Sequence, residues 1–101
     1  MRTALRVKIS ARAATEVRKA AQWWAENRPS APGAVAADLA EAVKLLAEQP
    51  GIGAKYEGSR TPEVRRLFLN RLGYFIYYKA DSVTLRVLTF WHASRENQPL
   101  L

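Results

Sequence analysis

The stretch EVRRLFLNRLGYFIYYKADSVTLRVLTFWH, residues 63–92, decides the fold class because it contains three β-strands in close succession. Residues 63–69, 74–80 and 83–92 are rich in the β-branched and aromatic side chains that are typical of strands. The connections NRLG and DS are short and contain turn residues. The three strands are therefore expected to pair in sequence order as an antiparallel meander.

Two apolar stripes at helical spacing precede the meander, along residues 11–27 and 31–49. The break NRPSAPG separates the two predicted helices, and QPGIG ends the second. They are expected to form an antiparallel hairpin. The first stripe consists of Ala13, Val17, Ala20 and Trp24, and the second of Val35, Leu39, Val43 and Leu46.

A strand before the helices completes the prediction. Residues 5–9, LRVKI, alternate apolar and basic side chains, and Ser10 is placed to cap the first helix. Residues 55–61 are expected to form a loop. The order β-α-α-β-β-β predicts an α+β fold, with the helical hairpin packed on one face of a small, mainly antiparallel sheet. With 101 residues, of which 49% are hydrophobic, residues 1–101 are expected to form a single domain.

The composition narrows the classes of function. Lys and Arg number 16 against 9 Asp and Glu, and the resulting charge of +7 favours an acidic partner, either nucleic acid or protein. The chain has no cysteine, which excludes disulfides and Cys-based zinc sites, and no metal or cofactor is expected. No run of residues reaches the length of a membrane span, so we expect a cytoplasmic protein without a membrane partner.

The last predicted strand carries large apolar side chains on both faces. Strict alternation puts Val83, Leu85, Val87 and Trp91 in one row and Arg86, Leu88, Phe90 and His92 in the other. If the helices cover the first row, Leu88 and Phe90 lie on an open surface rimmed by basic residues, which is typical of a partner-binding groove. The alternative is that loops or chain ends cover them.

Four motifs in order, QPGIG, VRRLFL, YFIYYK and LRVLTFWHASREN, resemble the RelE/ParE superfamily of type II toxins. The resemblance covers almost the whole chain, and it implies a bacterial toxin that a cognate antitoxin neutralises in a hetero-oligomeric complex. The C-terminal segment of the antitoxin would wrap over the sheet and helices of the toxin. The residues expected to contact it are Arg65, Arg86, Leu88, Phe90, His92 and Arg95.

The superfamily includes two kinds of toxin. RelE-like members are ribosome-dependent mRNA interferases, which need a base for the 2′-hydroxyl, a cation for the phosphorane and an acid for the leaving oxygen. An ordinary histidine titrates near pH ~6.5, which makes the single histidine the natural base or acid. On this alternative the catalytic residues would be His92, Arg65, Arg95, Lys55 and Tyr78, with Arg66 in place of Arg65 as a variant.

The ParE-like alternative is favoured. Only ASRENQPLL follows His92, without the tyrosine or second histidine of many RelE-like nucleases, and HASREN resembles the ParE form of this strand end. ParE-like toxins inhibit DNA gyrase by binding and are not known as nucleases, so the resemblance favours a binding inhibitor over an enzyme, and no catalytic residue is favoured. An inactive toxin homologue or a basic module that binds nucleic acid directly remains a further alternative.

The hairpin and the third strand supply the residues expected to contact the target. Trp23 and Trp24 lie about 100° apart on a helix, so one faces inward and the other, expected to be Trp23, is exposed. Arg65 and Arg66 point to opposite faces of their strand, and alternation does not decide which faces the groove. The resemblance favours Arg65, and the expected target-binding residues are Trp23 and Arg65.

Overall fold

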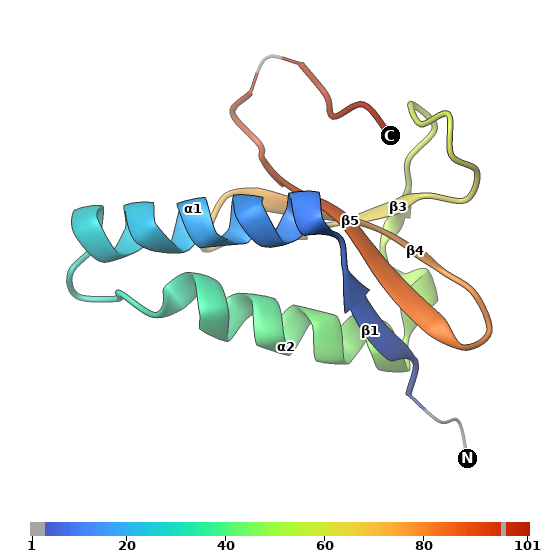
Figure 1. Ribbon diagram of the computed structural model, residues 1–101, viewed down its shortest axis with the longest axis horizontal. Helices are drawn as coiled ribbons and strands as arrows, with labels where there is room; N and C mark the ends of the chain where they lie inside the picture. Colours follow the sequence, from blue (N-terminus) through green and yellow to red (C-terminus); the bar gives the residue numbers. More distant parts are fainter. Residues whose placement is uncertain (1–3, 96) are drawn as a thin grey trace.

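The computed structural model describes residues 4–95 and 97–101 (Figure 1). Its elements follow the predicted order, with one short helix and one short strand added between the second long helix and the meander. They are β1 (Arg6–Ile9), α1 (Ala11–Asn27), α2 (Ala34–Glu48), the 3-10 helix η1 (Pro50–Ile52), β2 (Ala54–Lys55), β3 (Arg65–Leu69), β4 (Tyr74–Ala80) and β5 (Thr84–His92).

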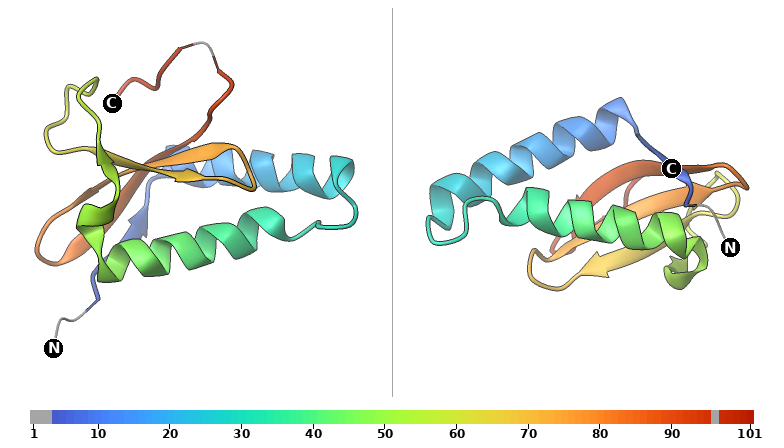
Figure 2. Two further views of the ribbon diagram at one scale, coloured as in Figure 1. Left: turned by 180° about the vertical axis from the view of Figure 1, so that it is seen from behind. Right: turned by 90° about the horizontal axis from the view of Figure 1, so that it is seen from below.

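The strands form one five-stranded sheet in the order β1-β5-β4-β3-β2. Strands β2 to β5 are antiparallel neighbours, whereas β1 pairs with β5 in parallel. Helices α1 and α2 form a hairpin on one face of this sheet (Figure 2). The predicted α+β class and the mainly antiparallel sheet are therefore confirmed.

Two boundaries differ from the prediction. Helix α2 begins at Ala34 rather than near residue 31, because Pro32 disfavours helical backbone in the residue before it. Residues 54 and 55, the second of which was expected in a loop, form β2 and pair with Arg66 and Arg65. A strand of two residues is too short to show an alternating pattern in the sequence.

Both predicted helical stripes face the main core. Ser10 caps α1 as expected, since its hydroxyl accepts a hydrogen bond from the Ala13 N–H at 3.0 Å. In α1, Ala13 and Ala20 are buried, and in α2 Val35, Leu39 and Leu46 are buried against the sheet. Within the described residues, neither helix combines the length and the apolar character needed to cross a membrane.

Strand β5 contains a β-bulge that decides which side chains face the helices. Tyr77 of β4 pairs with Thr89, whereas Tyr78 pairs with Val87, so Leu88 is an extra residue in β5. The alternation of side chains is therefore reversed after Leu88. Phe90, beyond the bulge, packs in the same helix-covered core as Val87 before it.

The predicted open surface of Leu88 and Phe90 is wrong, because the strand does not alternate strictly. Phe90 is only 1% exposed and stacks on Tyr74 with 4.4 Å between the ring centroids, so it belongs to the main core. Leu88 is half-buried in a second cluster on the opposite face, built around Tyr56, Val64, Tyr77 and Trp91. The alternative prediction is correct at this point, since Leu101, from the chain end, packs against the same cluster.

Side chains from the start of α1 satisfy backbone groups at the bulge. The Ser10 hydroxyl donates to the Leu88 carbonyl at 2.9 Å. The Glu16 carboxylate accepts from the Thr89 hydroxyl at 2.6 Å and from the Phe90 N–H at 3.1 Å. Because buried polar groups need partners, these contacts fix α1 to β5 at the point where the strand changes register.

We predict that Glu16→Ala destabilises the protein by about 1–3 kcal/mol, because it leaves the buried Thr89 hydroxyl and the Phe90 N–H without their acceptor. Urea unfolding measured by circular dichroism gives the free energy of unfolding. Glu26→Ala, on the exposed side of the same helix, is the matched control and should cost much less. Equal losses in the two variants would contradict the role of Glu16.

Candidate functional site

His92, the last residue of β5, lies on the helix-covered side of the sheet. Its ring packs edge-on against Tyr74 with 4.7 Å between centroids. Its Nδ1 accepts a hydrogen bond from the Ser94 N–H at 3.1 Å and lies 2.5 Å from the Ser94 hydroxyl oxygen. The imidazole therefore stabilises the turn in which the Arg95 N–H bonds to the His92 carbonyl.

A pocket of about 420 Å³ lies beside His92, between the end of α1 and the sheet. Trp24 packs against the main core, whereas Trp23 is 48% exposed, so the predicted orientation of the two rings is confirmed. The Arg28 guanidinium lies 5.4 Å from the Trp23 ring centroid, within cation–π range. We call this site the tryptophan pocket, and it is lined by Trp23, Trp24, Arg28, Arg71, Leu72, Tyr74 and His92.

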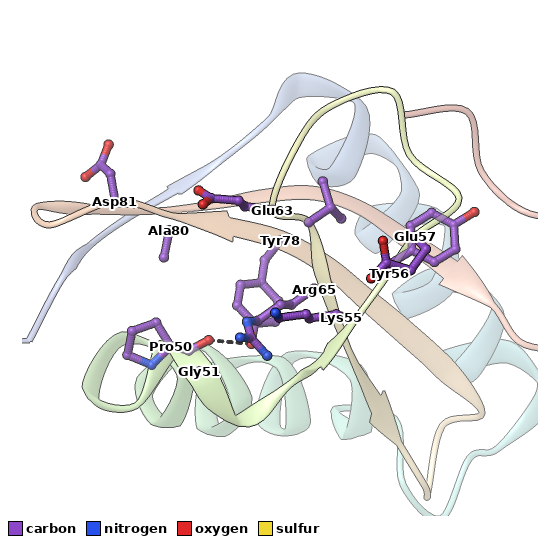
Figure 3. A pocket seen from close by; sticks show the side chains of 11 residues that line it. Pro50, Gly51, Lys55, Tyr56, Glu57, Glu63, Arg65, Tyr78, Ala80 and Asp81 are labelled. Atoms are coloured by element: carbon purple, nitrogen blue, oxygen red, sulfur yellow. Dashed lines mark hydrogen bonds between the residues drawn. The ribbon is translucent and has the colours of Figure 1, made fainter.

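A second pocket, of about 520 Å³, lies where η1 and β2 meet β3 and β4 (Figure 3). The Arg65 guanidinium donates to the Gly53 carbonyl at 2.7 Å. The Tyr78 hydroxyl donates to the Pro50 carbonyl at 2.7 Å and accepts from the Gly53 N–H at 2.9 Å. We call this site the arginine pocket. Its lining includes Pro50, Gly51, Lys55, Tyr56, Glu57, Glu63, Val64, Arg65, Tyr78, Ala80 and Asp81.

Burial raises the pKa of the Tyr78 phenol above its ordinary value, with smaller opposing effects from the Gly53 N–H and Arg65. The phenol is therefore neutral at pH 7, and both its donor and its acceptor functions are used within the fold. Tyr78 supports the backbone of residues 50–53 and is not a free acid or base.

Arg65 and Arg66 point to opposite faces, and the structure shows which face each occupies. Arg65 lines the arginine pocket next to Tyr78, its register partner in β4. Arg66 lies on the face of the second cluster, where its guanidinium is 4.4 Å from the Phe75 ring centroid and donates to the Tyr77 hydroxyl at 3.0 Å. Arg65 is thus the arginine on the helix side of the sheet.

Comparison with known families identifies the chain. The family model described as "ParE toxin of type II toxin-antitoxin system, parDE" matches residues 7–97. This chain belongs to the ParE toxin family. The solved structures include a similar chain described as "Chromosomal ParDE TA system from P. aeruginosa", with a TM-score of 0.70 and 20% sequence identity. The match covers 89% of this chain and 97% of that one, which shows a shared fold, whereas no curated protein matches.

This member of the ParE family brings together only part of the set predicted for an mRNA interferase, since Lys55, Arg65 and Tyr78 line the arginine pocket whereas His92 and Arg95 lie elsewhere. Tyr74 pairs with His92 and Tyr78 with Arg65, so the histidine and the arginine lie opposite residues of β4 that are four positions apart, about 13 Å along the strand. Arg95 lies elsewhere again, with its guanidinium 4.1 Å from the Trp91 ring centroid.

The six residues expected to contact an antitoxin are also dispersed in this ParE-family fold. Arg65 lies in the arginine pocket and His92 in the tryptophan pocket, while Phe90 lies in the main core. Arg86 is exposed and pairs with Lys79, on the face of the second cluster. The remaining two, Leu88 and Arg95, also lie on that face, against the second cluster.

Sequence reasoning missed the importance of Gly53, which it interpreted as part of a helix stop. A Cβ atom at Gly53 would lie 2.4 Å from the Tyr78 hydroxyl oxygen and 2.9 Å from the Arg66 carbonyl oxygen. The sequence carried no clear signal for this close approach, because the adjacent strand β2 has only two residues and was not predicted.

We predict that Gly53→Ala lowers the free energy of unfolding by about 1–3 kcal/mol, because the new methyl group must displace the Tyr78 hydroxyl from the backbone it supports. Thermal unfolding of purified protein measures the loss. Gly51→Ala is the matched control, since no atom lies within 4 Å of a Cβ there. A stable Gly53→Ala protein would show that the contact tolerates a side chain.

Proposed function

We propose that this chain is a toxin that inhibits DNA gyrase by binding and that a cognate antitoxin neutralises it. Membership of the ParE toxin family over residues 7–97 supports the proposal. The net charge of +7 favours association with an acidic protein segment, which is the chemistry expected of the antitoxin. The second candidate is a RelE-like mRNA interferase.

The separation of His92, the natural base or acid, from the cations of the arginine pocket is the observation that favours binding over RNA cleavage. Transphosphorylation needs a base, a cation and an acid within reach of one phosphate. Here His92 and Arg65 line different pockets, and Arg95 stacks on Trp91. The His92 Nδ1 also already accepts from the Ser94 N–H.

We assign the target contact to the exposed face of Trp23 in the tryptophan pocket and not to His92, which lines the same pocket. Tryptophan and arginine are both enriched among interface hot spots. Trp23 is 48% exposed, and Arg28 adds a cation at its face. Arg65, on the same side of the sheet but at the other pocket, is the second expected contact.

We predict that His92→Gln retains most of the toxicity, with a loss of less than about tenfold, because a binding inhibitor needs no proton transfer at this imidazole. A nuclease that depends on its only histidine would lose on the order of 10²- to 10⁴-fold. The measurement pairs a gyrase supercoiling assay with primer extension on mRNA after expression without antitoxin.

We expect both the unaltered protein and His92→Gln to inhibit gyrase and to leave the mRNA intact. mRNA cuts that disappear in the variant, together with normal supercoiling, would reverse the assignment and make the protein an mRNA interferase. Unfolding of the variant is detected separately by circular dichroism.

We predict that Trp23→Ala weakens gyrase inhibition by about 30-fold or more, since removal of a tryptophan hot spot costs on the order of 2 kcal/mol. Val83→Ala is the matched control, because Val83 is also an exposed hydrophobic residue, at 58%, but lies in the turn before β5. If both variants inhibit gyrase as the unaltered protein does, the target surface lies elsewhere.

A further inference from the structure

Residues 97–101, which we call the strap, lie across the face of the sheet opposite the helices. The strap returns from the end of β5 towards the loop between β2 and β3 (Figure 2). Pro99 is buried and Leu101 packs against the second cluster. The strap thus lies on an apolar seat, the second cluster, whose buried aromatic residues are Tyr56, Tyr77 and Trp91.

The seat holds the strap almost entirely through the strap's main-chain oxygens. The Trp91 indole N–H donates to the Asn97 carbonyl at 3.1 Å, and the Arg12 guanidinium donates to the Leu100 carbonyl at 2.8 Å. The Leu101 oxygen accepts from the Arg60 N–H at 2.8 Å. In a side-chain contact, the Tyr56 hydroxyl donates to the Gln98 amide oxygen at 2.7 Å.

A seat that offers donors to main-chain carbonyls binds extended peptide with little dependence on sequence. Any extended segment with a small apolar group in place of Pro99 can accept the same hydrogen bonds. The seat therefore has the chemistry of a peptide-binding groove that the chain fills with its own residues.

The charges around the seat favour a different occupant from the strap. Three guanidinium groups lie over its rings: Arg12 and Arg95 at 5.7 and 4.1 Å from the Trp91 centroid, and Arg66 at 5.5 Å from that of Tyr56. The strap, NQPLL, has no charged side chain to pair with them. A segment that carries carboxylates would make the same main-chain bonds and in addition form charge-assisted ones.

We propose that the strap is a displaceable occupant and that an extended, acidic segment of the antitoxin replaces it on this seat. The inference rests on the proposed function for the existence of the antitoxin. On this proposal the strap must leave the seat before the antitoxin binds there. The apparent affinity for the antitoxin is therefore proportional to the fraction of molecules in which the strap has left.

The first test follows the strap in the unaltered, ¹⁵N-labelled protein, with the antitoxin encoded beside it as the probe. On complex formation the Leu100 and Leu101 amides should become mobile by heteronuclear NOE, and the Trp91 indole signal should shift. A complex in which these amides stay ordered would overturn the inference alone. Failure of the unaltered protein to bind any such antitoxin would overturn the proposed function, and this inference with it.

The second test locks the strap on its seat with a disulfide between Ser59→Cys and Leu101→Cys. These two residues are close in the native protein, where the Ser59 hydroxyl donates to the Leu101 main-chain oxygen at 3.1 Å. The chain has no other cysteine, so oxidation forms one defined bond and reductant releases it. The oxidised form should bind the antitoxin at least about tenfold more weakly than the same protein after reduction. If the oxidised and reduced forms bind the antitoxin with equal affinity, and thiol titration shows that the disulfide has formed, the inference is wrong. The single variant Ser59→Cys is the control for effects of the oxidant and the reductant.

Discussion

The bulge at Leu88 is the local feature on which the rest of the structure depends. It would leave buried backbone groups without partners if β5 stood alone, and Ser10 and Glu16 from the start of α1 supply those partners. The same contacts therefore fix the register of β5 and the position of α1. By reversing the alternation of β5, the bulge also places Phe90 in the main core and Trp91 on the opposite face.

The sequence predicted the fold well where side-chain periodicity is strong. The helical stripes, the Ser10 cap and the meander all depend on patterns repeated over several residues, and each is present. The faces of β5 were assigned wrongly beyond Leu88 because a bulge depends on distant partners, here 78 and 74 residues earlier in the chain, and leaves no periodic signal of its own.

The candidate sites were less predictable than the fold for a similar reason. Helical geometry indicated that one of Trp23 and Trp24 is exposed, expected to be Trp23, and strand alternation indicated that Arg65 and Arg66 lie on opposite faces. The grouping of residues into two pockets depends on register, which places Tyr74 opposite His92 and Tyr78 opposite Arg65. The strap, with no alternation and no charged side chain, gave no indication of where it packs, since most of its hydrogen bonds are made by main-chain oxygens.

The distribution of the basic residues supports a protein partner over a nucleic acid. A nucleic-acid site aligns its cations along one track that follows the phosphates. In this fold several arginines lie over aromatic rings at separate places: Arg28 over Trp23 beside α1, and Arg66 and Arg95 over Phe75 and Trp91 on the opposite face. A guanidinium held over a ring presents an apolar surface together with a positive charge, which matches a segment that combines apolar and acidic side chains. These three arginines are therefore divided between two surfaces suited to protein segments, which agrees with the proposal that the chain acts by binding one protein and is neutralised by another.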